Sequence, residues 1–277
     1  RIIEKEPKNR EIMNLEKAFV PKTRKKVLIS NDFREILITQ NTTITLLSGR
    51  RRNMIVEIPW KKRKLVAQLI DPDRAGEETL VNAARLADEA GVDIFLAGGS
   101  LTSVPVADVI KRLKQLSSIP VVLFPGNLTQ LTAGADAVFM LSLISGRNPE
   151  LLIGSHVIAA PVLKNMRERV IPVGYMLIDC GGGTSVEYMS QTSPIPSGKN
   201  DIAVATALAG EMLGMKAIYL EGGSGAARPV NPSMIKAVSD ELTIPVITGG
   251  GIDSAEKVEV AFGAGAGAVA LAGGGAD

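Results

Sequence analysis

The chain has 277 residues, enough for one large α/β domain with a full hydrophobic core. Apolar residues make up 45% of the sequence and aromatic residues only 4%, a balance that suits parallel strands wrapped by helices. The single cysteine, Cys180, excludes an internal disulfide bond and favours a reducing compartment, so we expect a cytoplasmic protein. No apolar run reaches the length of about 18 residues that a membrane span needs, so no span is predicted.

The net charge of +2 conceals a basic first segment. Residues 1–64 hold 17 of the 31 Lys and Arg residues but only 7 of the 29 Asp and Glu residues. The runs 36–38 and 44–47 are candidate short strands, although no pattern organises them. We interpret residues 1–64 as a basic N-terminal extension, disordered or not native to the protein. It carries no recognisable nucleic-acid motif, so we expect no nucleic-acid partner, and a binding role on nucleic acid or anionic lipid is the minor alternative.

From Leu65 onward, short apolar runs alternate with helical patterns, which is typical of βα units. The predicted strands are 65–70, 94–97, 121–124, 138–143, 170–178, 218–220, 246–248 and 268–271. The predicted helices are 77–90, 104–116, 149–166, 202–213, 232–242 and 254–262. Only residues 126–134 join the third and fourth strands, which is short for a crossover helix. The pattern predicts a (β/α)₈ barrel domain over residues 65–277. The alternative, an open doubly wound sheet, lacks the G-x-G-x-x-G turn after its first strand.

Polar and glycine residues follow most of the predicted strands. Because active sites in such barrels lie at the C-terminal ends of the strands, these residues predict a site for a phosphorylated ligand. The glycines after the last three strands, at 222–225, 249–251 and 273–275, are the strongest signal. Backbone N–H groups bind phosphate, and glycine lets them approach it closely. That the same glycines serve only as tight turns is the minor alternative.

Two acidic positions are candidates for chemistry. Asp71 ends the first strand and is a candidate Mg²⁺ ligand, whereas Asp73 precedes a helix and fits a capping role. Glu221 ends the sixth strand and is a candidate general base, with a structural role for the loop amides as the alternative. His156 lies inside a predicted helix, and Cys180 has no histidine nearby in sequence, so we expect neither to be a catalyst.

Seven stretches of the chain match the pattern of one known family. They are LIDPD (69–73), FLAGGS (95–100), FPGN (124–127), LSLISGRNPELLIG (141–154), TSVEYMSQTSPIP (184–196), DIAVATALAGEMLGMKAIYLEGGSG (201–225) and ITGGGI (247–252). Together they closely resemble the geranylgeranylglyceryl phosphate synthases, a family that includes heptaprenylglyceryl phosphate synthases. The resemblance is to the larger, archaeal and Bacteroidetes-type group. It implies a modified TIM barrel with irregular chain in place of the third helix, in agreement with the short 126–134 connection.

The resemblance also implies an activity and its residues. It implies Mg²⁺-dependent transfer of a geranylgeranyl or similar polyprenyl group from its diphosphate to the C3 hydroxyl of sn-glycerol 1-phosphate. Asp71 matches the family's metal aspartate and Ser100 its second magnesium ligand. The positions that match glycerol-phosphate contacts are Tyr219, Leu220, Glu221, Gly222, Gly223, Ser224, Gly225, Gly250 and Gly251, with Glu221 as the base. Members of this group are commonly oligomeric, often hexamers, so a homo-oligomer is expected.

The sequence departs from the family in two places. Gly222 stands where the family usually has Ala. Gly273 and Gly274 stand where the family has a phosphate-binding Gly-Asn pair followed by a last helix, so we expect a truncated or altered C-terminus. A different phosphate-sugar barrel enzyme is the main rival function, although an aldolase would normally show a strand-end lysine, and none follows strands six or seven.

Overall fold

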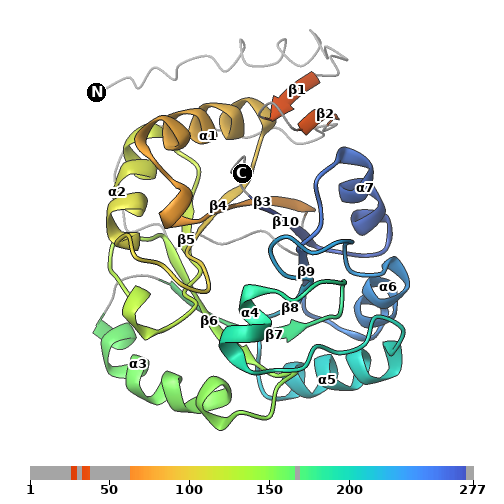
Figure 1. Ribbon diagram of the computed structural model, residues 1–277. Coiled ribbons are helices and arrows are strands. Elements are labelled where there is room, and N and C mark those ends of the chain that lie inside the picture. The colour runs from red at the N-terminus through yellow and green to blue at the C-terminus, as the bar shows by residue number, and fades with distance from the viewer. Residues whose placement is uncertain (1–25, 30–32, 38–62, 166–168, 273–277) are drawn as a thin grey trace, which may run out of the picture.

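Eight parallel strands close into a barrel in the computed structural model, which describes residues 26–29, 33–37, 63–165 and 169–272 (Figure 1). The strands are β3 (Leu65–Ile70), β4 (Ile94–Ala97), β5 (Val121–Leu123), β6 (Ala137–Leu143), β7 (Arg169–Leu177), β8 (Ala217–Glu221), β9 (Val246–Gly249) and β10 (Ala268–Ala272). They pair in chain order, and β10 pairs with β3 to complete the ring. The predicted barrel is therefore confirmed and the open doubly wound sheet is excluded.

Seven α-helices surround the barrel in the described residues. They are α1 (Glu77–Ala90), α2 (Val106–Leu116), α3 (Ser155–Asn165), α4 (Ser185–Ser190), α5 (Asn200–Met212), α6 (Pro232–Glu241) and α7 (Ala255–Gly263). The helix predicted over 149–166 is two elements, because a π-helical turn at Glu150–Gly154 precedes α3. The helix predicted from residue 104 begins at Val106, because the Ser103 and Val104 N–H groups bind Asp73 instead of entering the helix.

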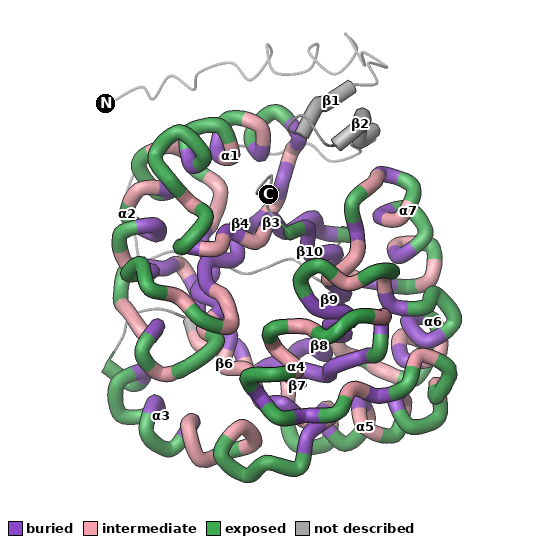
Figure 2. The backbone as a smooth tube through the Cα atoms, in the orientation of Figure 1, coloured by how far each residue is buried: buried purple, intermediate pink, exposed green. Residues whose placement is uncertain are grey.

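Apolar residues on every strand build two cores. Residues such as Phe139 and Tyr219 fill the barrel interior, and their neighbours along each strand, such as Val138 and Ile218, pack against the helices. Both faces of the strands are thus buried, which explains why the strands read as continuous apolar runs. Figure 2 shows the buried strands inside a ring of helices whose outer faces are exposed.

The barrel wall is incomplete between β5 and β6. These strands pair over only two positions, Val122 with Ala137 and Leu123 with Val138. In contrast, β6 pairs with β7 over its whole length. The connection between β5 and β6 contains one short 3₁₀ turn, Leu128–Gln130, in place of a helix. The prediction of irregular chain in place of the third helix is therefore confirmed. The C-terminal part of β6, from Phe139 to Leu143, has no pairing partner on β5.

Two further strands lie before the barrel. β1 (Lys26–Ile29) and β2 (Phe33–Leu37) form a two-stranded antiparallel sheet, and β2 overlaps the strand predicted at 36–38. The candidate strand at 44–47 lies outside the described residues. So do Gly273, Gly274 and residues 275–277, on which the predicted truncated or altered C-terminus falls. Among the described residues, no helix is long and apolar enough to cross a membrane.

Candidate active site

The loops that follow β8 and β9 lie against each other at one end of the barrel. The Gly222 N–H donates to the carbonyl oxygen of Gly249 at 2.9 Å. A Cβ atom added to Gly250 would lie 2.6 Å from the nitrogen of Gly223, and both glycines have positive φ angles, of 86° and 94°. A larger residue at Gly250 would displace the loop after β8, and one at Gly223 would displace Thr184. The glycine clusters predicted from the sequence therefore meet in space.

The glycine loops after β8 and β9 together form a rim at this end of the barrel. Two N–H groups of this rim already donate hydrogen bonds to other groups of the protein. The Gly222 N–H binds the neighbouring strand end, and the Gly223 N–H donates to Oε1 of Glu221 at 2.6 Å. A phosphate at this rim would therefore be met chiefly by the N–H groups of residues 224–225 and 250–251. Ser224 and Gly225 are in a turn directly after these two glycines, with Ser224 exposed.

Glu221 is a buried carboxylate held by hydrogen bonds from several sides. Only 7% of the residue is exposed. Its Oε1 accepts from the Gly223 N–H, and its Oε2 accepts from the Tyr175 hydroxyl at 3.0 Å. Burial raises the pKa of Glu221 above its usual value, while hydrogen bonds from Gly223, Tyr175 and Tyr219 partly oppose the rise. A fixed carboxylate with a raised pKa suits a general base.

Tyr219 and Leu220 precede Glu221 on β8 but point in opposite directions. Tyr219 shares the inner face with Glu221 and stacks on Tyr175, with ring centroids 5.3 Å apart. Leu220 is fully buried on the helix side, so its side chain lies away from the barrel mouth and only its backbone is available to a ligand. Tyr175 was missed from the sequence because it lies inside a strand, two residues before its end. Its spacing from Leu177 could have placed it on the inner face.

Asp71 and Asp73 have different roles in the structure. Asp73 accepts hydrogen bonds from the Ser103 N–H, the Ser103 hydroxyl and the Val104 N–H, so it anchors the loop after β4. The predicted capping of the following helix is not its role, since the N-cap residue of α1 is Gly76, which makes no side-chain cap. The hydrogen bond from Val104 is the main cause of the lowered pKa of Asp73. Within the described residues, the Asp71 carboxylate accepts one hydrogen bond, from the Asp73 N–H at 3.0 Å, which leaves further oxygen lone pairs for another partner.

The predicted metal ligands lie at neighbouring strand ends. Asp71 follows β3 and Ser100 follows β4, and these strands pair at Ile70 and Ala97. The Asp71 carboxylate lies beside Gly99, 3.7 Å from the position of a Cβ atom there. No group of three or more His, Cys, Asp or Glu residues suited to a metal occurs in the described part of the chain. One carboxylate and one hydroxyl fit Mg²⁺, which keeps waters and takes phosphate oxygens as further ligands.

Gln130 connects the loops after β4 and β5. It is buried, its Nε2 donates to the Gly99 carbonyl oxygen at 2.7 Å, and its Oε1 accepts from the Gly126 N–H at 3.1 Å. This clamp fixes the backbone next to Ser100. Sequence reasoning missed Gln130 because it lies in irregular chain, where no periodicity marks a buried side chain.

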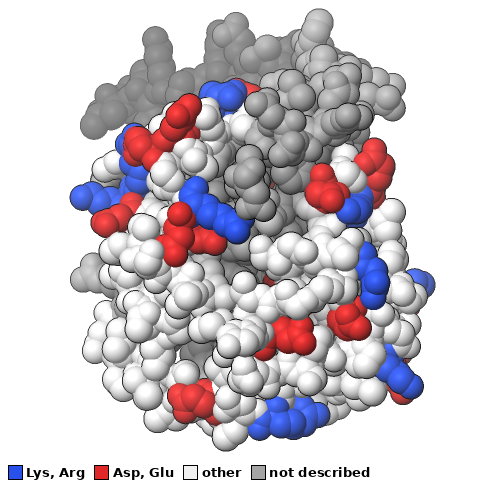
Figure 3. All heavy atoms as spheres, in the orientation of Figure 1, with Lys and Arg blue, Asp and Glu red and all other residues white. Residues whose placement is uncertain are grey.

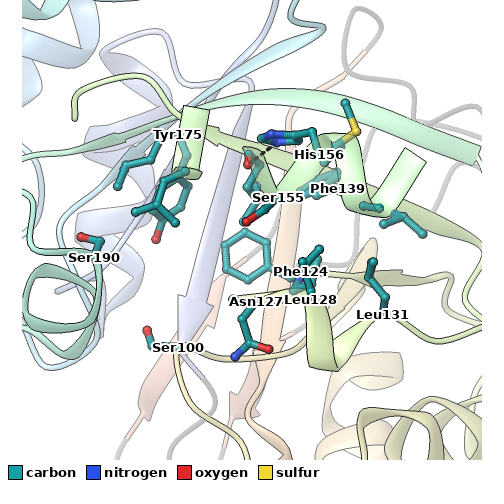
Figure 4. Close-up of a pocket in the computed structure, with 18 of the residues that line it drawn as sticks. Ser100, Phe124, Asn127, Leu128, Leu131, Phe139, Ser155, His156, Tyr175 and Ser190 are labelled. Carbon is teal, nitrogen blue, oxygen red and sulfur yellow. Dashed lines mark hydrogen bonds between the residues drawn. The ribbon is translucent and has the colours of Figure 1, made fainter. Parts of the chain in front are cut away.

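An apolar cavity of about 300 Å³ runs from Ser100 into the gap between β5 and β6. Its walls come from the barrel interior, the irregular connection and α3. They include Phe124, Phe139, Met140, Ala159 and Leu163. Figure 4 shows Ser100 and His156 on opposite sides of Phe124. In the view of Figure 3, the surface between α2 and α3 is largely uncharged. The missing third helix thus leaves room for an apolar ligand.

His156 and Cys180 are both buried. His156 lines the cavity with one ring nitrogen, Nε2, 2.8 Å from the Leu141 carbonyl oxygen, so it supports the unpaired edge of β6. Burial raises the pKa of the Cys180 thiol to about 11, which keeps it neutral and unreactive.

A closed barrel with a glycine rim, a buried carboxylate and an apolar cavity defines a phosphate-site barrel protein with room for a long apolar group. The sequence profile of the PcrB family matches residues 58–273. The chain belongs to this family.

Named relatives agree with this assignment. The geranylgeranylglyceryl phosphate synthase of Spirosoma linguale is 49% identical over 205 residues, which are 74% of this chain and 82% of the relative. That of Chitinophaga pinensis is 47% identical over 215 residues, 77% of this chain and 85% of the relative. The structure of (S)-3-O-geranylgeranylglyceryl phosphate synthase from Thermoplasma acidophilum with sn-glycerol-1-phosphate superposes with a TM-score of 0.72 at 31% identity. It covers 77% of this chain and 86% of that one. The resemblance predicted from the sequence is confirmed.

Proposed function

We propose that the protein is a prenyltransferase that moves a geranylgeranyl or similar polyprenyl group from its diphosphate to the C3 hydroxyl of sn-glycerol 1-phosphate. The product is the ether precursor of a lipid. One observation carries the proposal: the buried Glu221 carboxylate lies at the glycine-lined rim and accepts a hydrogen bond from Tyr175, which lines the apolar cavity. The names of the relatives and the ligand of the Thermoplasma structure support the same reaction.

The proposed chemistry is a substitution at the allylic carbon of the prenyl donor. The glycerol phosphate binds by its phosphate to the N–H groups of residues 224–225 and 250–251, so that its C3 hydroxyl faces Glu221. The hydroxyl oxygen forms a bond to C1 of the donor as the bond from C1 to the diphosphate breaks. Glu221 takes the hydroxyl proton, and the Tyr175 hydroxyl holds the carboxylate in place.

Asp71 and Ser100 would hold Mg²⁺ on the diphosphate side of the site. When bound, the ion neutralises charge on the diphosphate and makes it a better leaving group. Support comes from the free lone pairs of Asp71 and from the position of Ser100 at the entrance of the apolar cavity. The prenyl tail would fill that cavity, whose walls also exclude water from the allylic centre.

A homo-oligomer and a cytoplasmic location are part of the proposal. The outer face of α3 and the turn before it expose Ile153, Val157, Ile158 and Val162 to between 47% and 65%. Apolar surface of this kind is typical of protein contacts and supports self-association.

The direct test is product formation from radiolabelled glycerol 1-phosphate and geranylgeranyl diphosphate, with and without Mg²⁺. Glycerol 3-phosphate serves as the control acceptor. We expect an ether product that requires Mg²⁺ and is selective for glycerol 1-phosphate. Absence of product with every prenyl diphosphate tried would favour another phosphate-sugar barrel enzyme.

Tyr175→Phe tests whether Tyr175 lowers the pKa of the proposed base, Glu221. The hydrogen bond from Tyr175 lowers the pKa of Glu221, so its loss should raise that pKa further. Because the base works only when ionised, activity is lost as the pH falls through this pKa. We expect the acid limb of the kcat profile to move up by about one pH unit, since a hydrogen bond to a charged group contributes roughly 1.5–3 kcal/mol. An unmoved acid limb would show that Glu221 does not control that limb.

Ala159→Phe tests the cavity as the tail site. Ala159 is buried on α3 and lines the cavity, so a phenyl ring there would occupy the space of the tail. We expect the KM for geranylgeranyl diphosphate to rise about 10-fold or more, as a loss of roughly 1.4 kcal/mol of binding predicts, with farnesyl diphosphate less affected. The KM for glycerol 1-phosphate should not change. Ala160→Phe is the matched control, because Ala160 is the next residue of α3 and is exposed. Equal effects of the two variants would contradict the assignment.

A further inference from the structure

Glu221 must lose the proton it gains before it can act again. This inference rests on the proposed function, because it concerns the fate of that proton. The carboxylate is almost inaccessible to solvent, and the titratable side chains closest to it are Tyr175, Tyr219 and Cys180. Both tyrosines are buried, and burial raises their pKa values as it raises that of the thiol, so all three groups are neutral and none is a base that could take the proton. Besides the side that faces the substrate, Glu221 borders a space beneath α4.

A small enclosed cavity lies on that side. Its free volume is about 10 Å³, which is about the room one water molecule needs. Glu221 and Gly222 line it from β8 and the loop that follows, Asp179 lines it from the end of β7, and Thr184 and Glu187 line it from the start of α4. The cavity therefore separates the buried carboxylate from two carboxylates nearer the surface.

A chain of contacts fixes α4 above this cavity. The Gly223 N–H donates to Glu221, and Gly223 packs so tightly on Thr184 that an added Cβ atom would lie 2.2 Å from Thr184 Cγ2. The Thr184 hydroxyl in turn accepts from the Glu187 N–H at 3.3 Å. In Figure 1, α4 lies over the ends of β7 and β8. Three successive contacts thus connect the Glu221 carboxylate to the backbone of Glu187.

Glu187 also borders open solvent. A second, open groove on the outer side of α4 is lined by Glu187 together with Tyr188, Gln191 and Leu101. Asp179 lines the small cavity and is itself exposed, but it does not line this groove, and its carboxylate accepts from the Gly181 N–H at 3.1 Å. Among the described residues that line the enclosed cavity, Glu187 is the carboxylate that links it to the groove.

We propose that Glu187 is a proton-relay residue that returns Glu221 to its ionised form after each transfer. When the ether bond has formed and the diphosphate has left, Glu221 holds the proton of the acceptor hydroxyl. Glu221 gives this proton to a water in the small cavity as that water passes one of its own to the Glu187 carboxylate. Glu187 then releases its proton into the groove, and both carboxylates end ionised.

Rapid-mix kinetics of the whole enzyme with Glu187→Gln test this relay. The first turnover starts with Glu221 already ionised, so it should keep the wild-type rate and yield one ether product per site. Later turnovers should be about 10-fold slower, with a larger solvent isotope effect in D₂O, because proton release then limits the rate. Glu187→Asp should recover part of the loss, and Asp179→Asn should show little of it. Glu78→Gln, an exposed position on α1, is the control for an ordinary surface charge.

Three outcomes would count against the relay, and they are distinguishable. An unchanged steady-state rate in Glu187→Gln would exclude it while leaving the prenyltransferase proposal intact. A first turnover slowed as much as the later ones, or a raised KM for glycerol 1-phosphate, would show that Glu187 positions the substrate or α4 instead. No ether product from the unmodified enzyme would remove both the relay and the reaction that it serves.

Discussion

Glu221→Gln should lower kcat for ether formation by about 10²–10⁴-fold, the usual contribution of a general base. Gln keeps the size of Glu221 and an oxygen that can accept from the Gly223 N–H, so the rim should stay in place. Binding of glycerol 1-phosphate, measured by calorimetry, should therefore change by less than about 10-fold. The loss should appear in kcat and not in the KM for the acceptor. Turnover at the wild-type rate would remove Glu221 from the role of base.

The pH profile gives an independent check on the same residue. Burial raises the pKa of Glu221, so the acid limb of wild-type kcat should lie above the ordinary glutamate range. Glu221→Gln has no carboxylate to titrate, so its residual activity should lose this limb. Glu241→Gln, at the exposed end of α6, should keep both the rate and the limb. An acid limb that persists in Glu221→Gln would assign it to another group.

Most of the barrel could be predicted because its signals are local. Strands buried on both faces are continuous apolar runs, and helices such as α2 repeat apolar residues at Val106, Ile110 and Leu113. The errors arose where a contact distant in sequence decides the outcome. Asp73 draws Ser103 and Val104 out of the predicted second helix.

Three other features of the fold could not be predicted from the spacing of apolar residues. The helix α4 has only six residues and follows three glycines, so its period is too short to detect. The π-helical turn before α3 has only five residues, too few for its wider spacing to be distinguished from an α-helix in sequence. The gap between β5 and β6 depends on how many residue pairs the two strands form, which no single segment shows.

Positions of the candidate site could be proposed from the sequence where one residue type carries the signal. Glycine at the ends of β8 and β9, and a lone carboxylate at the ends of β3 and β8, predicted the rim, Asp71 and Glu221. The residues that hold the site in place, Tyr175 and Gln130, could not be predicted, because they form hydrogen bonds with residues on other strands and loops. Leu220 was included among the predicted ligand contacts together with its neighbours. The two-residue period of a strand, however, places its side chain on the face of β8 opposite to that of Glu221. Strand-end positions therefore identify candidate groups, and the packing around them decides what each can do.

Asp71→Asn should reduce kcat/KM for the prenyl diphosphate by at least about 100-fold, because a metal on a diphosphate contributes several kcal/mol of charge stabilisation. An Asn oxygen can still accept from the Asp73 N–H, so the turn after β3 should persist. The Mg²⁺ concentration for half-maximal rate should rise, while binding of glycerol 1-phosphate should stay unchanged. Asp73→Asn is the matched control, since Asp73 binds the loop of Ser103 and Val104. It should lower the Tm without moving the Mg²⁺ requirement. If the two variants exchanged these effects, Asp73 would be the metal ligand and Asp71 the loop anchor.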